Sequence, residues 1–305
     1  MFARIAGIAL CAAGMLGCAA VRPISAPGVP WAETEPLSWK TTCEDWDEWD
    51  KPGPPYQIYG GVYYVGTCGI TSLLLVSDSG HVLIDSGTDT GAQVVIANIK
   101  KLGFDPHDVK YLLTSHEHFD HVGGIARLQA ATGATILANA PTSTVLRSGK
   151  PSEDDPQVHS HHPSFPAVIG EIRLLSDQEV LSIGGREIHS LPTPGHSPGA
   201  LSWSWLEIDR DTGELMVYAD SLSPISSDSY KFSDHPEYVE SYRKGIETIR
   251  SFGRCLLMTP HPSASKMPER IVATGLRRGV SLACTEYANT IEARLDKRLA
   301  DETAP

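Results

Sequence analysis

The sequence has few cationic residues and no cluster of them. Lys and Arg total 25 against 37 Asp and Glu, which gives a formal net charge of -12 over 305 residues. Because nucleic-acid phosphates and anionic membrane surfaces bind clustered Lys and Arg, this composition argues against both as partners. Low-complexity tracts are also lacking, and 41% of the residues are hydrophobic. We therefore expect one large globular domain with an N-terminal extension.

No two cysteines have the CxxC spacing of a cysteine-built zinc site, although the sequence contains six cysteines. Cys11 and Cys18 fall in the apolar N-terminal segment. The other four are Cys43, Cys68, Cys255 and Cys284. An even number in an oxidising compartment predicts disulfides, and proximity in sequence favours Cys43 with Cys68 and Cys255 with Cys284. Four cysteines allow three connectivities, and the sequence leaves the choice open.

No apolar run is long enough to span a bilayer well, including the run at the N-terminus. Residues 1–20, MFARIAGIALCAAGMLGCAA, place one Arg before an apolar run that ends in small residues, which is the layout of a signal peptide. Cleavage near Ala20 competes with lipidation at Cys18, because MLGC is an imperfect lipobox. Both predict a periplasmic protein, with membrane contact only if Cys18 carries a lipid.

Hydrophobic periodicity predicts strands and helices in two similar halves. Residues 21–56 are rich in Pro, Trp and acids and predict an irregular arm, and residues 57–305 form the expected domain. The runs GGVYYVG, TSLLLVS and GHVLIDSG predict antiparallel strands; TDTGAQVVIANIKKLGF predicts a helix, VKYLLTS a buried strand and VGGIARLQAATG a helix. Four more strands are expected next, in QEVLSIG, REIHSLPTP, ALSWSWLEI and ELMVYADS. They are followed by a helix in PEYVESYRKGIETIRSF, a strand in CLLMTP and a helical tail from Met267. Strands then helices, twice over, predict an α/β fold with two sheets packed face to face and helices outside.

The segment SHEHFDHVGG, residues 115–124, follows the buried strand VKYLLTS. It brings His116, His118, Asp120 and His121 into six residues. Imidazole and carboxylate together suit zinc, and a catalytic zinc site usually keeps only three protein ligands. Four candidate ligands exceed one such site, so the segment predicts a centre with two metals.

Two further histidines stand directly after apolar strands, His196 in LPTPGHSPGA and His261 in LLMTPHPSAS. They are the expected additional ligands. We interpret the remaining histidines as ordinary core, surface or loop residues. These are His81, His107, His189 and His235, together with His159, His161 and His162 of the loop SGKPSEDDPQVHSHHPSFP.

The chain resembles the metallo-β-lactamase superfamily, whose signature HxHxDH is matched by HEHFDH. LIDSG, SHEHFDHVGG, PTPGHSPGALSW, YADSLSP and TPHP occur in the family's order over nearly the whole mature chain. Within the family it is most similar to subclass B3, because His121 can complete a second metal's ligand set and Ser221 occupies the region where other β-lactamases place a cysteine ligand. The resemblance implies a four-layer αββα sandwich.

The resemblance also implies two zinc ions per chain. His116, His118 and His196 would hold the first, and Asp120, His121 and His261 the second, with a metal-bound hydroxide as nucleophile and no covalent intermediate. Asp120, Ser221 and Gln157 are the candidate catalytic residues. Ser221 and Ser223 would bind the substrate carboxylate, and Gln157 would donate to the carbonyl oxygen. Asp85 is the candidate for orienting a ligand, although a turn-forming Asp is an alternative reading.

Two positions bear on this assignment. Glu117 stands where relatives more often carry a small residue, and we expect its side chain to point to solvent because its neighbours in an extended loop point the other way. The alternative is an inward side chain, which would lower the affinity for anionic substrates by like-charge repulsion. Asp220 precedes Ser221, and superfamily members that cleave other substrates use an aspartate here to bridge both metals. Adjacent side chains on a strand point to opposite faces, so we expect only one of the two, Ser221, to enter the site.

Three functions follow as hypotheses. The first is an exported, monomeric di-zinc enzyme that opens the β-lactam ring of penicillins, cephalosporins or carbapenems. The second is a lactonase, thioesterase or other metallohydrolase on the same fold. The third is a periplasmic zinc-binding protein without catalysis, which would require closed coordination spheres rather than open positions for water.

Overall fold

The computed structural model describes residues 36–160, 162–209, 211–267, 269–270 and 282–304. The expected signal peptide, the lipobox at Cys18, His161 and part of the C-terminal tail lie outside the described residues. Among the helices of the described part, none is both long and apolar enough to cross a membrane.

Two β-sheets form the centre of the fold. The first contains β1 (Tyr56–Tyr59), β2 (Val62–Tyr64), β3 (Leu73–Leu75), β4 (His81–Ile84), β5 (Val109–Leu113), β6 (Thr135–Ala138) and β7 (Ile172–Leu174), in that spatial order. The second has the order β12 (Leu256–Met258), β11 (Thr212–Tyr218), β10 (Leu201–Asp209), β9 (Arg186–Pro192) and β8 (Val180–Ile183). Strands β1 to β4 pair antiparallel, as expected for this region, whereas β4 to β7 pair parallel. In the second sheet only the pair β11 and β12 is parallel.

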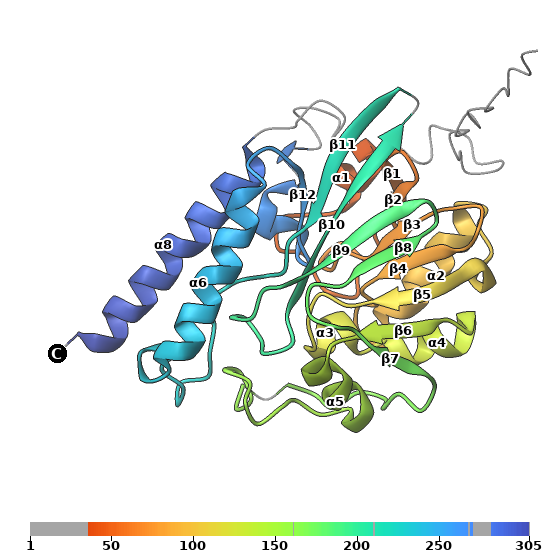
Figure 1. The fold of residues 1–305 in the computed structure, drawn as a ribbon. Coiled ribbons are helices and arrows are strands. Elements are labelled where there is room, and N and C mark those ends of the chain that lie inside the picture. Colours follow the sequence, from red (N-terminus) through yellow and green to blue (C-terminus); the bar gives the residue numbers. More distant parts are fainter. Residues whose placement is uncertain (1–35, 161, 210, 268, 271–281, 305) are drawn as a thin grey trace, which may run out of the picture.

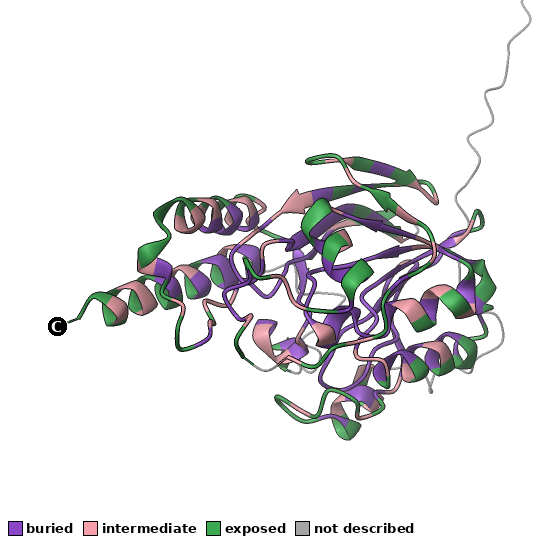
Figure 2. Ribbon diagram, turned by 90° about the horizontal axis from the view of Figure 1, so that it is seen from below, coloured by how far each residue is buried: buried purple, intermediate pink, exposed green. Residues whose placement is uncertain are grey.

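Helices cover the outer face of each sheet (Figure 1). The helices α2 (Gly91–Lys101), α4 (Ile125–Thr132) and α5 (Ala140–Ser148) lie on the first sheet. The helices α6 (Pro236–Ser251) and α8 (Ala283–Thr303) lie on the second sheet. Figure 2 shows the helices exposed on their outer sides and buried where they face the sheets. The expected four-layer αββα sandwich is therefore confirmed.

The alternation of strand side chains explains the layering. In β3, Leu73 and Leu75 point into the core between the two sheets, and Leu74 points to the core under α2 and α4. In β11, Met216 and Tyr218 face the same central core, and Val217 faces α6 and α8. Because successive side chains of a strand point to opposite faces, such continuous apolar runs need cover on both sides.

The arm that precedes the first sheet is attached at several points and is not wholly irregular. It contains the helix α1 (Pro36–Thr42), whose Trp39 is fully buried in the central core. The disulfide between Cys43 and Cys68 ties the arm to the loop after β2. A second disulfide joins Cys255 to Cys284, and both pairings are the ones that proximity in sequence favours.

Candidate metal centre

The candidate ligands lie in loops that follow the C-terminal ends of strands from both sheets. The 115–121 segment follows β5 and ends in the short helix α3 (Phe119–Val122), His196 follows β9, and His261 follows β12. Parallel pairing of β4 with β5 and of β11 with β12 brings the ends of neighbouring strands to one edge. The backbone amide of Leu201 donates to the Ser115 carbonyl over 2.6 Å, which joins the two sheets at this edge.

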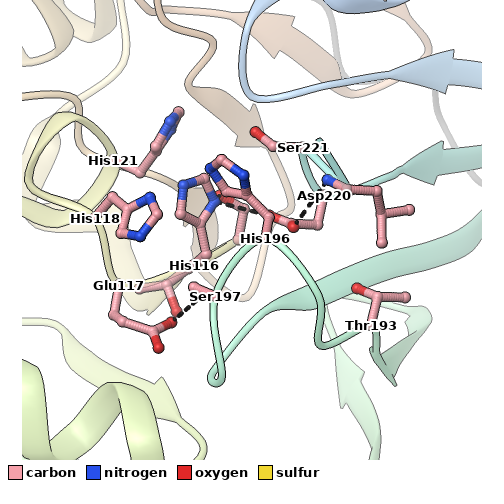
Figure 3. A network of polar contacts seen from close by, with 12 residues as sticks. His116, Glu117, His118, His121, Thr193, His196, Ser197, Asp220 and Ser221 are labelled. Carbon is pink, nitrogen blue, oxygen red and sulfur yellow. Dashed lines mark hydrogen bonds and ion pairs between the residues drawn. The ribbon is translucent and has the colours of Figure 1, made fainter. Parts of the chain in front are cut away.

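His116, His118 and His196 form the first group. Their ring centroids lie 4.7 to 4.8 Å apart in every pair, with interplanar angles of 69 to 90°. All three side chains are buried. One ligand atom from each lies within 4.8 Å of the others, so the three rings surround one point (Figure 3).

One nitrogen of each ring in this group is held by a fixed acceptor. His116 Nδ1 lies 2.7 Å from Asp220 Oδ1, and His118 Nε2 lies 2.8 Å from Asp155 Oδ2. His196 Nδ1 donates to the Ser223 carbonyl over 3.0 Å. Because carboxylates and carbonyls only accept, these contacts fix the tautomers and leave His116 Nε2, His118 Nδ1 and His196 Nε2 as the nitrogens that can bind a metal.

The nitrogen left over on His116 supports this interpretation. His116 Nε2 is buried and has no hydrogen-bond partner among the described residues. A buried polar atom without a partner costs free energy, and a bound metal would remove that cost.

Asp120, His121 and His261 form the second group. Asp120 Oδ2 lies 3.0 Å from His121 Nε2 and 3.4 Å from His261 Nε2, and the two nitrogens are 3.3 Å apart. Ligand atoms at 2.0 to 2.1 Å from a tetrahedral zinc are separated by roughly 3.3 Å. The three donor atoms therefore already have the spacing that zinc requires.

The Nδ1 atoms of His261 and His121, which face away from the three donor atoms, also lie near acceptors. His261 Nδ1 lies 3.3 Å from the Gly69 carbonyl. His121 Nδ1 lies 3.7 Å from Asp85 Oδ2, which is beyond hydrogen-bond distance but close enough for charge attraction. Asp85 itself accepts hydrogen bonds from the Ser115 amide and hydroxyl at 2.6 Å and from the Tyr218 hydroxyl at 2.7 Å. The side chain expected to orient a ligand thus lies beside His121.

Burial favours neutral His116 and His196 in the first group, and the second group favours an ionised carboxylate. Burial also opposes protonation of His118, but the hydrogen bond to Asp155 raises the pKa of that ring. Burial and the neighbouring His118 lower the pKa of His196 to about 3. Burial alone would raise the pKa of Asp120, but His121 and His261 hold it well below its usual range. Burial likewise opposes protonation of His121, yet Asp120 and Asp85 raise its pKa to about 10. Without a metal ion, the Asp120 carboxylate and the protonated His121 ring therefore stabilise each other's charged forms.

The structure corrects the expected position of Glu117. Its side chain is 2% exposed and accepts hydrogen bonds from the Ser197 hydroxyl and the Gly199 amide, each over 2.7 Å. The prediction that it points to solvent is wrong, because the chain folds another loop over it. Burial raises the pKa of Glu117, and the hydrogen bond from Ser197 partly offsets the rise.

The loop of residues 149–171 also differs from expectation. His162 is not a solvated loop residue, since its ring stacks on that of His118 with centroids 5.0 Å apart and an interplanar angle of 16°. His159, in contrast, is exposed. The same loop supplies Asp155 to His118, a contact between residues 37 positions apart that no sequence spacing indicates.

The remaining candidate residues surround the first group. Gln157 is buried, with Nε2 3.4 Å from His196 Nδ1. The Ser221 hydroxyl is buried and without a partner among the described residues, whereas Ser223 Oγ donates to the Ser221 carbonyl over 3.3 Å. Asp220 and Ser221 both lie near His116, with Asp220 behind its ring (Figure 3). Asp220 and Ser221 do not alternate between opposite faces as strand residues would, because β11 has already ended at Tyr218.

Comparisons with known proteins agree with this geometry. The family model of the metallo-β-lactamase superfamily matches residues 65–207. The solved structure of the MIM-2 metallo-β-lactamase is 48% identical, with a TM-score of 0.80 over 88% of this chain and 100% of that chain. MEM-A1, a subclass B3 metallo-β-lactamase isolated from a soil metagenome library, is 37% identical, with a TM-score of 0.78 over 84% of this chain and 98% of that chain.

Curated relatives match over a shorter stretch. A probable metallo-hydrolase of Burkholderia pseudomallei (strain 1710b) is 30% identical over 155 residues, which is 47% of this chain and 50% of that protein. The chain therefore spans about half the length of the curated relatives it matches.

The strand-end loops, the two ligand groups and these matches define a metal-dependent hydrolase fold. The chain belongs to the metallo-β-lactamase superfamily. Its structural neighbours are subclass B3 metallo-β-lactamases.

Asp155→Ala is expected to weaken zinc binding by about tenfold or more, because loss of a residue that orients a metal ligand typically costs 10- to 100-fold in affinity. The measurement is competition with a chromophoric zinc chelator. Asp154→Ala, which removes the exposed neighbouring carboxylate, is the matched control and should bind zinc like the unchanged protein. Equal affinities of the two variants would contradict an orienting role for Asp155.

Proposed function

We propose that the protein is a di-zinc β-lactamase. His116, His118 and His196 bind one zinc, and Asp120, His121 and His261 bind the other. The observation that carries this proposal is the pair of three-ligand groups, one of them already at zinc spacing, on a fold whose neighbours at 37 to 48% identity are subclass B3 enzymes.

The chemistry follows from the ligand set. Zinc bound here would activate water at neutral pH and polarise the attacked carbonyl. Three protein atoms would hold each ion, which would leave coordination positions open for water and substrate, unlike the closed coordination of a purely structural site. Asp120 stays ionised, and we assign it to orienting the attacking water.

The substrate is held by groups beside the first ligand triad. The unpartnered Ser221 hydroxyl is available to donate to the carboxylate that penicillins, cephalosporins and carbapenems share. We assign Gln157, whose Nε2 lies 3.4 Å from His196 Nδ1, to donating to the carbonyl oxygen as it gains negative charge. Ser223 contributes through its carbonyl, which orients His196, and its hydroxyl is already engaged with Ser221.

Asp220 distinguishes this proposal from the lactonase and thioesterase alternative. Its Oδ1 is engaged with His116, and its Oδ2 accepts from the Leu222 amide over 3.3 Å. With both oxygens engaged, Asp220 serves as an acceptor behind His116 and not as a bridge between two metals. This favours a β-lactam substrate.

We also propose that the enzyme is exported to the periplasm and acts as a monomer. Two disulfides support export, because disulfides persist in oxidising compartments.

The zinc-loaded protein is expected to hydrolyse a carbapenem and a cephalosporin, measured by the loss of β-lactam absorbance. Removing the zinc with a chelator should abolish turnover, and restoring zinc should recover it. Hydrolysis of an acyl homoserine lactone or a thioester, with no β-lactam turnover by the same zinc-loaded preparation, would contradict the proposal and support the alternative.

Ser221→Ala is expected to raise KM for a cephalosporin by about tenfold with little change in kcat, because a hydrogen bond to a charged group contributes roughly 1.5–3 kcal/mol. Steady-state kinetics measure both constants. Ser223→Ala is the matched control, and its KM should change less because that hydroxyl is engaged with the Ser221 carbonyl. A larger rise in KM for Ser223→Ala than for Ser221→Ala would assign the substrate carboxylate to Ser223 instead.

A further inference from the structure

Glu117 connects the segment of residues 115–121 to the loop of residues 193–200, which carries His196. One of its carboxylate oxygens accepts from the Ser197 hydroxyl, and the other accepts from the Gly199 amide. Figure 3 shows the Glu117 side chain turned toward Ser197, beneath the rings of the first group. Glu117 thus lies between the ligands His116 and His118 in the sequence. It is also hydrogen-bonded to Ser197, the residue that follows His196.

The 193–200 loop is shaped to receive this carboxylate. A Cβ atom on Gly199 would lie 2.4 Å from Thr142 Oγ1 and 2.6 Å from Glu117 Oε2, so a larger residue would displace the Thr142 side chain, the carboxylate or both. Gly195 has a φ of +156°, and a Cβ there would lie 2.4 Å from the Tyr242 ring. The two glycines allow the loop to pass closely between Tyr242 and Glu117.

The far side of the same loop is fixed by α5. The Gly199 carbonyl accepts from Asn139 Nδ2 over 2.9 Å and from the Thr142 hydroxyl over 3.1 Å. The Gly199 amide donates to Glu117 on the other side, so the peptide units on both sides of this residue are anchored. His196, three residues earlier, takes its position from a loop that is anchored by Glu117 at Ser197 and Gly199.

The carboxylate is not itself a candidate ligand. Each of its oxygens is engaged with a donor of the 193–200 loop, and the side chain is buried. A small residue at this position would leave two buried donors without an acceptor and would free the loop from the 115–121 segment.

We propose that Glu117 is a positioning residue that sets His196 relative to His116 and His118 and thereby determines the affinity of the first zinc site alone. This inference rests on the ligand sets of the proposed function.

The test isolates each zinc site by removing a ligand from the other one. In a His261→Ala background only the first group is complete, and in a His196→Ala background only the second is complete. Adding Glu117→Met is expected to weaken zinc binding about tenfold or more in the first background and to change it by no more than about twofold in the second. Met has nearly the same volume but no acceptor oxygen, so both the Ser197 hydroxyl and the Gly199 amide lose their acceptor.

Two further variants separate positioning from general destabilisation. Ser197→Ala removes one of the two hydrogen bonds and should weaken the same site by a smaller factor. Glu207→Gln changes a comparably buried carboxylate that accepts from the Gly61 amide and pairs with Arg186 near the far end of β10. It should lower the thermal unfolding temperature without altering zinc affinity.

Equal zinc affinities with and without Glu117→Met in the first background, or equal losses in both backgrounds, would overturn the inference. Circular dichroism of each metal-free variant establishes that it is folded. Because the readout is zinc affinity, it is independent of substrate: absence of β-lactam turnover in the unchanged protein would refute the proposed function and leave this test interpretable.

Discussion

The site depends on the hydrogen bonds made by the ring nitrogens that face away from the centre. Burying an imidazole leaves both nitrogens in need of partners, and an acceptor on one of them fixes which nitrogen remains for a metal. Hydrogen bonds or close approaches of this kind hold every candidate ligand histidine, from acceptors that lie far from it in the sequence. These acceptors are the carboxylates of Asp220, Asp155 and Asp85 and the carbonyls of Ser223 and Gly69.

The rest of the fold brings those acceptors to one place. The parallel pairs β4 with β5 and β11 with β12 end at the same edge, and the Leu201 amide joins the two sheets there. The disulfide between Cys43 and Cys68 holds the arm beside Gly69, whose missing Cβ lets the arm's backbone approach closely. Burial of apolar side chains on both faces of the strands stabilises this edge without using any of its polar groups.

The order of strands and helices could be predicted from periodicity, and the HEHFDH segment could be placed after a buried strand because both signals are local. The hydrogen bonds that hold the ligands and their loops could not be predicted from the sequence, because they join residues far apart in it. Glu117 bonds residues 80 and 82 positions away, and Asp220 lies 104 positions from His116. The alternation rule predicted that Glu117 faces solvent, but it describes an isolated extended segment and takes no account of a loop folded over it. Asp155 stands in an acidic, Pro-containing stretch that resembles any exposed loop, so its contact with His118 depends on tertiary structure alone.

The most direct test of this account is a calorimetric titration of the metal-free protein with zinc. Two equivalents are expected to bind per chain, since two complete three-ligand groups lie at the strand ends. Saturation at one equivalent would contradict it, because one of the two groups would then not bind zinc.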